Sequence, residues 1–273
     1  MSAEYLSINL SHWNSRVPLH ERGCGLERFR ENPALLSEVV RFDLPRLGEV
    51  AGLEAVHLQC HIGTDTLSLA RLGARMTGLD FSAPALAVAR RLAADCGVQI
   101  EYVEAELYEA PRALGRERFD LVYTGIGALC WLPDIRRWAK VVSELLRPGG
   151  RLFLREGHPM LSTLGEPRSD GLAVIEHPYF ETPGGTRFVQ RKTYVPHQGE
   201  LASPLCVDFS HGLAEILTAL FDAGLSLTAI EEHDSAPWDF LPGATIADAR
   251  GEHRLRERPE RLAATYTLQA SKR

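Results

Sequence analysis

The sequence has no apolar run long enough to cross a membrane, and its N-terminus lacks the basic-then-apolar pattern of a secretion signal. Its five cysteines are odd in number and include no Cys-x-x-Cys pair, so a disulfide framework is not indicated. An excess of positive charge is also missing, because the formal net charge is −6. These absences predict a cytoplasmic protein with reduced thiols and no nucleic-acid or membrane partner.

The stretch from residue 55 to 82 is the most informative part of the chain. Val56 and Leu58 alternate with polar neighbours, as in a strand, and an amphipathic helix follows that Gly73 ends. A second strand over residues 75–79 delivers Asp80 at its end. Ligands bind at the C-terminal edge of an open parallel sheet, where an acid suits a ribose diol. This pattern predicts a nucleoside-binding half-domain.

Helices and strands continue to alternate after this half-domain. Ser82 is a plausible N-cap for the next helix, which begins near Pro84. We expect helices over residues 84–96, 135–146 and 211–223, and strands over residues 100–103, 119–124, 151–155, 225–231 and 264–270, with Pro148-Gly149-Gly150 stopping the second helix. Hydrophobic residues make up 45% of the 273, which is enough for the core of a large domain.

Five segments, HLQCHIG, TGLDFS, EAEL, FDLVYTGIGALCWLPD and LLRPGGRLFLRE, follow one another in this order. In this they resemble the class I S-adenosylmethionine-dependent methyltransferases that act on small molecules. The resemblance covers residues 50–156 well and residues 207–270 more weakly. It implies an α/β fold, with a Rossmann-like, seven-stranded, mostly parallel sheet and helices on both faces. It also implies S-adenosylmethionine as cofactor and methyl transfer to an oxygen, nitrogen or carbon atom of a small organic molecule, such as a secondary metabolite.

The first loop departs from the family pattern of acid-x-Gly-x-Gly-x-Gly. Only Gly63 keeps a glycine, and His57 stands at the acidic position, where it cannot attract the methionine amino group as a carboxylate would. We therefore expect Gln59 and His61 either to adopt ordinary dihedral angles or to leave the ligand further away. A dinucleotide pyrophosphate needs a glycine-lined approach, which S-adenosylmethionine does not. An NAD(P)-dependent oxidoreductase and a non-catalytic nucleoside-binding regulator stay open as alternatives.

The resemblance also implies which residues contact the cofactor. Asp80 would accept from both ribose hydroxyls, Phe81 would stack on the adenine, and Glu106 would accept from the adenine amino group. The turn after the fourth strand would lie beside the methionine portion. The expected set is Gln59, Cys60, His61, Gly63, Asp80, Phe81, Glu106, Leu107, Thr124, Gly125 and Ile126.

Residues 157–206 hold six prolines and six glycines, which indicates a β-hairpin or a short antiparallel addition over the sheet edge. The first fifty residues are expected to form helices packed against the same edge. We therefore divide the chain into an N-terminal helical cap, residues 1–50, and a methyltransferase domain, residues 51–273, with a substrate-side insertion at about 157–206. Residues 250–261 are locally basic but interleaved with glutamates, which is typical of a solvated loop, and a patch for an anionic substrate is the alternative.

Catalysis depends first on alignment, which can lower the barrier of an in-line displacement by roughly 7–11 kcal/mol. His158 follows the fifth strand, and imidazole groups suit general-base work near neutral pH, although a hydrogen-bonded loop histidine is the alternative. Trp131 is a candidate for a cation–π contact with the sulfonium or for plain core packing. The expected acceptor-side residues are Trp13, Trp131, Tyr194 and His211.

A zinc site built from His57, Cys60 and His61 is not expected. Adjacent strand residues point to opposite faces, and no fourth ligand with zinc-site spacing follows. The expected partner is a small-molecule substrate, with the protein a monomer or a homodimer.

Overall fold

A seven-stranded sheet forms the centre of the computed structural model, which describes residues 4–166, 168, 170 and 172–273. Its strand order is β3-β2-β1-β4-β5-β12-β8. The strands are β1 (Glu54–Leu58), β2 (Arg75–Asp80), β3 (Glu101–Glu104), β4 (Phe119–Thr124), β5 (Leu146–Gly157), β8 (Leu225–His233) and β12 (Thr265–Lys272). Neighbours among β1 to β5 pair in parallel, whereas β12 is antiparallel to both β5 and β8. The predicted mostly parallel sheet and its closing antiparallel pair are confirmed.

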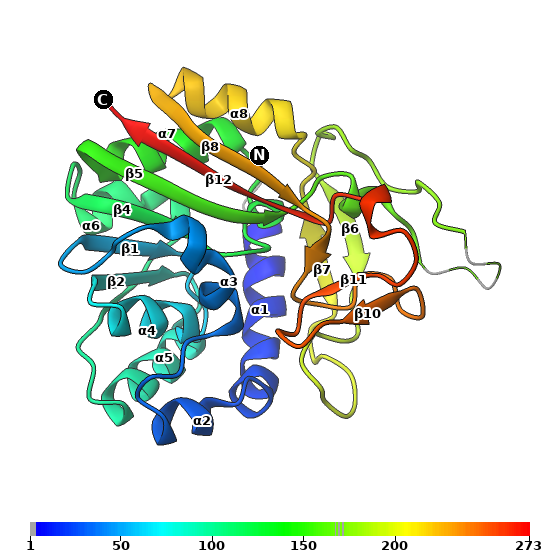
Figure 1. Cartoon of the computed structure of the whole chain (residues 1–273), viewed down its shortest axis with the longest axis horizontal. Helices are drawn as coiled ribbons and strands as arrows, with labels where there is room; N and C mark the ends of the chain where they lie inside the picture. Colours follow the sequence, from blue (N-terminus) through cyan, green and yellow to red (C-terminus); the bar gives the residue numbers. More distant parts are fainter. Residues whose placement is uncertain (1–3, 167, 169, 171) are drawn as a thin grey trace.

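Helices cover both faces of this sheet (Figure 1). They are α3 (Glu38–Leu47), α4 (Thr64–Arg71), α5 (Ala83–Asp95), α6 (Ala110–Leu114), α7 (Ile135–Leu145) and α8 (Leu213–Asp222). Because successive strand residues point to opposite faces, Val122 and Leu152 pack in the core with α7 and α8. Their neighbours Tyr123 and Phe153 pack in the core with α3 and α4. The alternation in sequence thus becomes two apolar layers.

The start of α5 and the start of β5 can be compared with the sequence-based expectations. The side chain of Ser82 accepts a hydrogen bond from the Ala85 N–H and caps α5, as expected. The fifth strand, however, begins at Leu146 rather than at residue 151, so Pro148-Gly149-Gly150 lies inside β5 and not between the helix and the strand. A Cβ on Gly150 would stand 2.8 Å from the Phe119 carbonyl oxygen, so a glycine lets the two strands approach here.

Helices form within the first fifty residues as expected, but α3 covers a face of the sheet, and the division of the chain at residue 50 stays a prediction. Helix α1 (Glu4–Gly23) runs between the sheet and a second, β-rich lobe, and α2 (Leu26–Glu31) follows it (Figure 1). Asn9 fixes α1 to strand β7 (Leu205–Asp208), because its side-chain amide donates to the Val207 carbonyl and accepts from the Val207 N–H. The helix therefore joins the two lobes.

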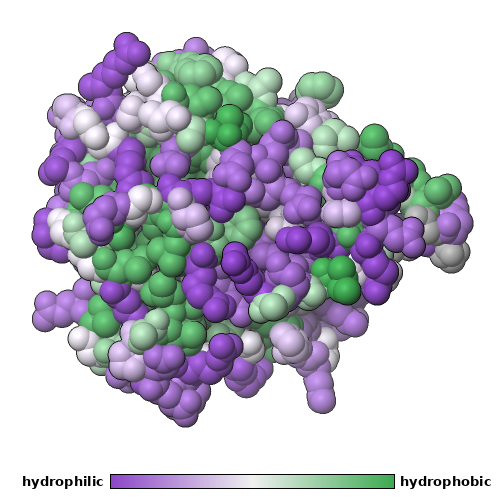
Figure 2. All heavy atoms as spheres, in the orientation of Figure 1, coloured by the Kyte–Doolittle hydropathy of each residue, from purple (hydrophilic) through white to green (hydrophobic). Residues whose placement is uncertain are grey.

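The insertion after β5 is β-rich, as expected. It contains the short helix η3 (Leu161–Thr163), an isolated bridge between Leu164 and Ile175, and β6 (Thr186–Val189) paired antiparallel with β7. Seven of its described large hydrophobic side chains are exposed: Met160, Leu172, Ile175, Phe180, Val189, Tyr194 and Leu205. Figure 2 shows hydrophobic residues on the outer side of this lobe. The insertion is thus held by few apolar contacts.

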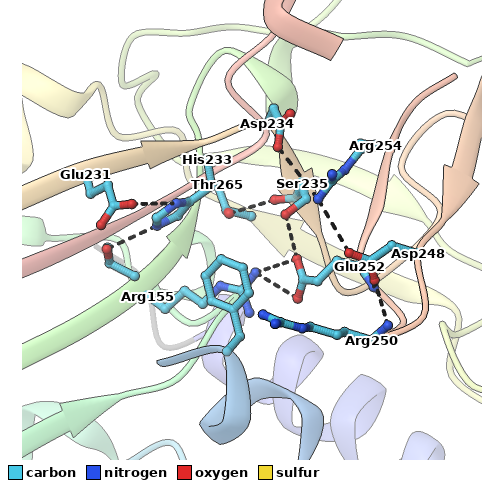
Figure 3. A network of polar contacts seen from close by, with 12 residues as sticks. Arg155, Glu231, His233, Asp234, Ser235, Asp248, Arg250, Glu252, Arg254 and Thr265 are labelled. Carbon is cyan, nitrogen blue, oxygen red and sulfur yellow. Dashed lines mark hydrogen bonds and ion pairs between the residues drawn. The ribbon is translucent and has the colours of Figure 1, made fainter. Parts of the chain in front are cut away.

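A second β-rich segment lies between β8 and β12 and was not predicted. Its strands are β9 (Ser235–Ala236), β10 (Thr245–Ala247) and β11 (His253–Leu255). Figure 3 shows how buried Arg155 of β5 donates to both Glu252 oxygens, at 3.0 and 2.8 Å, while Ser235 also donates to Glu252. The solvated loop expected over residues 250–261 is therefore wrong for Glu252, which is 3% exposed.

No helix among the described residues is both long and apolar enough to span a membrane.

Candidate active site

A cavity of about 1070 Å³ opens at the C-terminal edge of β1, β2 and β4, with α1 forming one wall. Nine of the eleven residues predicted to contact the cofactor line it: Gln59, Cys60, His61, Asp80, Phe81, Glu106, Leu107, Gly125 and Ile126. Gly63 and Thr124 do not. Thr124 is buried, and Gly63 faces the inside of the fold, where a Cβ would stand 2.6 Å from the Tyr102 hydroxyl.

The loop after β1 keeps the backbone shape of a glycine loop without the glycines. Gln59 has φ 56° and His61 has φ 49°, both in the left-handed region, and Gly63 has φ 79°. The expectation of ordinary dihedral angles is therefore wrong, and the distance to the ligand stays a prediction. The N–H of His61 points to Asp80, to which it donates at 2.8 Å. Two strained residues preserve the approach to the cavity.

Asp80 ends β2 with its carboxylate on the cavity. One oxygen accepts from the His61 N–H and the other from the Ser82 N–H, each at 2.8 Å. A carboxylate has about four lone-pair sites, so two stay available for a ligand. Burial raises the pKa of Asp80 to about 6, although these two N–H groups favour the charged form.

The other predicted nucleoside contacts lie beside Asp80, at Phe81 and just after the end of β3. The Glu106 side chain accepts from the Tyr108 N–H at 2.8 Å, and burial raises its pKa. Phe81 is half-buried and Leu107 is buried, and both line the cavity. Asp80, Phe81 and Glu106 thus come together around one volume, as predicted.

The position of the missing first-strand acid is occupied by an uncharged ring. Burial lowers the pKa of His57 to about 3, and its Nδ1 lies 2.9 Å from the Thr66 hydroxyl. A carboxylate nevertheless stands close by, because a Cβ on Gly125 would lie 3.6 Å from Asp65 Oδ2 and 3.2 Å from His57 Nε2. Asp65 lines the cavity from the first turn of α4. The sequence analysis missed it, because an acid there also suits a helix start.

The turn after β4 is positioned by a second residue that was missed, Glu156 of β5. Its buried carboxylate accepts from the N–H groups of Gly127, Ala128 and Leu129, at 2.7 to 2.8 Å. The indole N–H of Trp131 donates to the Gly127 carbonyl at 2.9 Å. Glu156 therefore fixes the orientation of this turn through its backbone.

A wider cavity of about 1790 Å³ adjoins the first and shares Trp13, Asp65, Trp131 and Tyr194 with it. Arg16 lines this second space, where its guanidinium carbon lies 4.7 Å from the Trp13 ring centre and 5.8 Å from that of Trp131. Arg16 is 5% exposed and donates to the Gln190 side chain at 2.5 Å. Within the described residues it forms no ion pair.

The two predicted histidines lie apart from these cavities. His158 lines neither of them, since its Nδ1 accepts from the Met160 N–H at 3.2 Å and its Nε2 lies 2.9 Å from Glu232. His211 lines a separate cavity of about 870 Å³, and its Nε2 donates to the Leu132 carbonyl at 2.7 Å. Trp13 and Trp131 lie where expected, their ring centres 5.3 Å apart, and Tyr194 is exposed at the mouth. The roles of all five residues stay predictions.

Comparisons with known proteins agree with this arrangement. Residues 56–152 match a family model described as a methyltransferase domain. A ubiquinone biosynthesis O-methyltransferase of Xanthomonas euvesicatoria pv. vesicatoria is 31% identical over 195 residues, which cover 70% of either chain. The protein of the same name from Cronobacter sakazakii is 35% identical over 124 residues, 45% of this chain and 49% of that one. The chain thus spans between about half and 70% of these two relatives.

Solved structures share the fold. An S-adenosylmethionine-dependent methyltransferase from Mesorhizobium loti superimposes with a TM-score of 0.62 at 23% identity, over 86% of this chain and 98% of that one. A geranyl diphosphate C-methyltransferase from Streptomyces coelicolor A3(2), solved with Mg²⁺, geranyl diphosphate and S-adenosyl-L-homocysteine, gives 0.56 at 14% identity, over 86% and 78%. At these identities the likeness concerns the fold alone.

Proposed function

The chain belongs to the class I S-adenosylmethionine-dependent methyltransferases, and we propose that its two adjoining cavities bind the cofactor and a small organic acceptor. One observation carries this proposal. Asp80, the loop at residues 59–63 and Glu106 surround a cavity at the sheet edge, and that cavity opens directly into a second one lined by aromatic side chains.

The nucleoside part of the cofactor is assigned to the C-terminal ends of β2 and β3. Ribose hydroxyls donate to the two unused lone-pair sites of Asp80, and the adenine lies between Phe81 and the segment of Glu106 and Leu107. Each charge-assisted hydrogen bond contributes about 1.5–3 kcal/mol. The loop residues Gln59, Cys60 and His61 face the remaining part of the cofactor. Gly63 shapes the turn behind them.

The methionine part is assigned to the space between that loop and the turn at Thr124, Gly125 and Ile126. Its ammonium group needs an anion, which neutral His57 cannot supply. The Asp65 carboxylate lies on this side of the cavity, close to both His57 and Gly125. We therefore assign to Asp65 the role that the family gives to the acid of the first strand.

The acceptor is assigned to the wider cavity, and Arg16 indicates its chemistry. Asp208 shares this cavity and attracts the buried Arg16, but the two form no ion pair among the described residues, so an anionic ligand group can compensate the guanidinium. An acceptor with a carboxylate or an ionised oxygen would supply it between Trp13 and Trp131. The name of the relatives, O-methyltransferase, supports oxygen as the attacking atom. That oxygen gives up its proton to solvent and forms the new bond to the methyl carbon as the carbon–sulfur bond breaks, which leaves S-adenosylhomocysteine.

The cofactor assignment can be tested with ligands that differ in one part. Calorimetry would compare S-adenosylmethionine, 5′-methylthioadenosine, which lacks the amino-acid portion, and NAD. We expect Asp65→Asn to weaken S-adenosylmethionine about tenfold or more and to leave methylthioadenosine unchanged, whereas Asp80→Asn weakens both. Tight NAD binding without S-adenosylmethionine binding would overturn the proposal, and an equal loss of both nucleosides in Asp65→Asn would remove Asp65 from it.

The acceptor assignment is tested by methyl-release assays with hydroxybenzoic acids and the matching hydroxybenzamides. We expect the acids to be the better substrates, and Arg16→Gln to raise the KM for the acids alone. Equal rates for the acids and the amides would show that Arg16 does not select an anion.

We further propose a cytoplasmic enzyme, monomer or homodimer, without a nucleic-acid partner. All five cysteines are free, which supports a reducing compartment. In this proposal residues 1–50 act as a cap on the methyltransferase domain, residues 51–273, and the insertion at about 157–206 closes the acceptor side.

A further inference from the structure

Three side chains that offer metal ligands meet where the insertion touches α8. They are Glu181 of the insertion, His211 just before α8, and Glu215 in its first turn. Their ligand atoms all lie within 4.8 Å of one another, and His211 Nδ1 is 3.8 Å from Glu215 Oε2. None of them belongs to the cofactor cavity or the wider cavity beside it.

The backbone fixes which nitrogen of His211 can bind a ligand. A carbonyl oxygen is only an acceptor, so the 2.7 Å contact between His211 Nε2 and the Leu132 carbonyl places a hydrogen on Nε2. In the neutral ring Nδ1 then carries a lone pair. This atom is buried and has no hydrogen-bond partner within the part of the chain that the structure describes. A ring held through one nitrogen by a backbone carbonyl is the usual second-shell arrangement of a metal-binding histidine.

The lone pair of Nδ1 faces two carboxyl groups, and the Glu181 and Glu215 side chains also lie close to each other, so three ligand groups converge. His211 is 6% exposed, Glu215 is half-buried and Glu181 is exposed, which leaves one side open to solvent. Three protein ligands and an open position are typical of a divalent ion that also keeps a water.

The neighbouring segment is built to bring Glu181 to this point. The Tyr179 hydroxyl accepts from the Leu213 N–H at 3.2 Å, and a Cβ on Gly212 would stand 2.9 Å from the Tyr179 ring. The absence of a side chain at Gly212 thus lets residues 179–181 lie against the start of α8. Phe180 between them is 77% exposed, so apolar burial does not hold this segment.

We infer that Glu181, His211 and Glu215 bind a divalent transition-metal ion, Zn²⁺ in the first place, which clamps the insertion to α8. An imidazole nitrogen with two carboxylates suits zinc better than magnesium or calcium, which prefer oxygen ligands alone. Zinc–ligand bonds of about 2.0–2.1 Å place tetrahedral ligands roughly 3.3 Å apart, so small side-chain rotations complete the site.

Calorimetry with zinc chloride on chelator-stripped protein tests this inference directly. We expect one zinc site in the wild type, no comparable site for Mg²⁺, and at least tenfold weaker zinc binding in both Glu181→Gln and Glu215→Gln. Glu200→Gln, which changes another exposed glutamate of the insertion, should bind zinc like the wild type. Circular dichroism checks that each variant is folded.

Limited proteolysis supplies a second readout that does not involve activity. Zinc should slow cleavage within residues 172–204 of the wild type and have no such effect on Glu181→Gln. The inference is overturned if the wild type takes up no zinc, or if all three variants bind it equally well, which would place the ion elsewhere on the protein.

Discussion

Asp80 combines a buried carboxylate with two backbone N–H donors, and its ionisation should be visible in cofactor affinity. Ribose hydroxyls donate to the charged form, and burial raises the pKa of this group in the free protein to about 6. We therefore expect affinity for S-adenosylhomocysteine to fall as the pH decreases from 8 to 5, with its midpoint near 6. Asp80→Asn should weaken binding at pH 8 by about 1.5–3 kcal/mol and flatten the pH profile.

Calorimetry at several pH values checks this expectation, with the fold of the variant confirmed by circular dichroism. Burial also raises the pKa of Glu106, a second carboxyl on this cavity. A pH profile that persists unchanged in Asp80→Asn would assign the titration to Glu106 or another group and not to Asp80.

His61 holds a left-handed backbone conformation, which an L-residue with a Cβ adopts at a cost of roughly 1–2 kcal/mol. His61→Gly and His61→Ala both remove the ring, so their difference isolates the backbone. We expect the glycine variant to be the more stable by about 1 kcal/mol in urea unfolding. At Arg91, inside α5, the same pair of substitutions should give the opposite order, because alanine favours a helix. A more stable alanine variant at residue 61 would show that the left-handed conformation is not kept in solution.

His158 was predicted to be a general base from its place after the fifth strand. A base needs a free lone pair facing the acceptor, and here Nδ1 is occupied by Met160 while Nε2 faces Glu232. We therefore expect His158→Gln to keep turnover within about tenfold of the wild type. A loss of roughly 10²–10⁴-fold, with cofactor affinity intact, would restore the role of a base. Rates measured between pH 6 and 9 in both proteins decide the matter.

At the scale of elements, the sheet of β9, β10 and β11 is joined to β5 by one buried ion pair. Arg155 and Glu252 are 0% and 4% exposed at their side chains, and Phe42 covers the guanidinium at 3.5 Å. Glu252→Ala leaves the arginine uncompensated, so we expect a loss of about 3–5 kcal/mol in the free energy of unfolding. Replacing both residues together, by Arg155→Met and Glu252→Leu, should recover part of it.

Urea unfolding followed by fluorescence measures these differences. Arg254 serves as a comparison in the same small sheet, because its contacts with Asp234 and Asp248 are at the surface. Arg254→Ala should change stability by no more than about 1 kcal/mol. Similar losses in Glu252→Ala and Arg254→Ala would show that the buried pair has no special part in attaching this sheet.

Over the whole molecule, the features that could be predicted from the sequence are those set by residues close together along the chain. The strand-helix pattern from β1 to β5 is written in local periodicity, and Asp80 follows from its place at a strand end. The ion pair of Arg155 and Glu252 joins residues 97 positions apart, so no local pattern marks it. Asp65 and Glu156 were missed for the same reason. Neither acid stands out in the sequence. Each can act at the site only because the turn after β4 folds against it.

The left-handed angles of Gln59 and His61 could not be predicted either, because residue type alone argues against them. Tertiary contacts decide here: the carboxylate of Asp80 draws in the His61 N–H, and the Gln59 amide donates to the Ala128 carbonyl. The family resemblance predicted the function correctly, although residue preferences alone gave the wrong backbone angles for this loop.

The attachment of α1 through Asn9 to Val207 has a consequence for how the protein is made. The two partners lie 198 residues apart, so the helix that walls the cofactor cavity leaves the ribosome before the strand that holds its other side. At about 5–20 residues per second, it waits on the order of 10–40 s. During translation α1 can therefore pack only on the sheet side, through Val17, and its link to the second lobe forms once β7 has emerged.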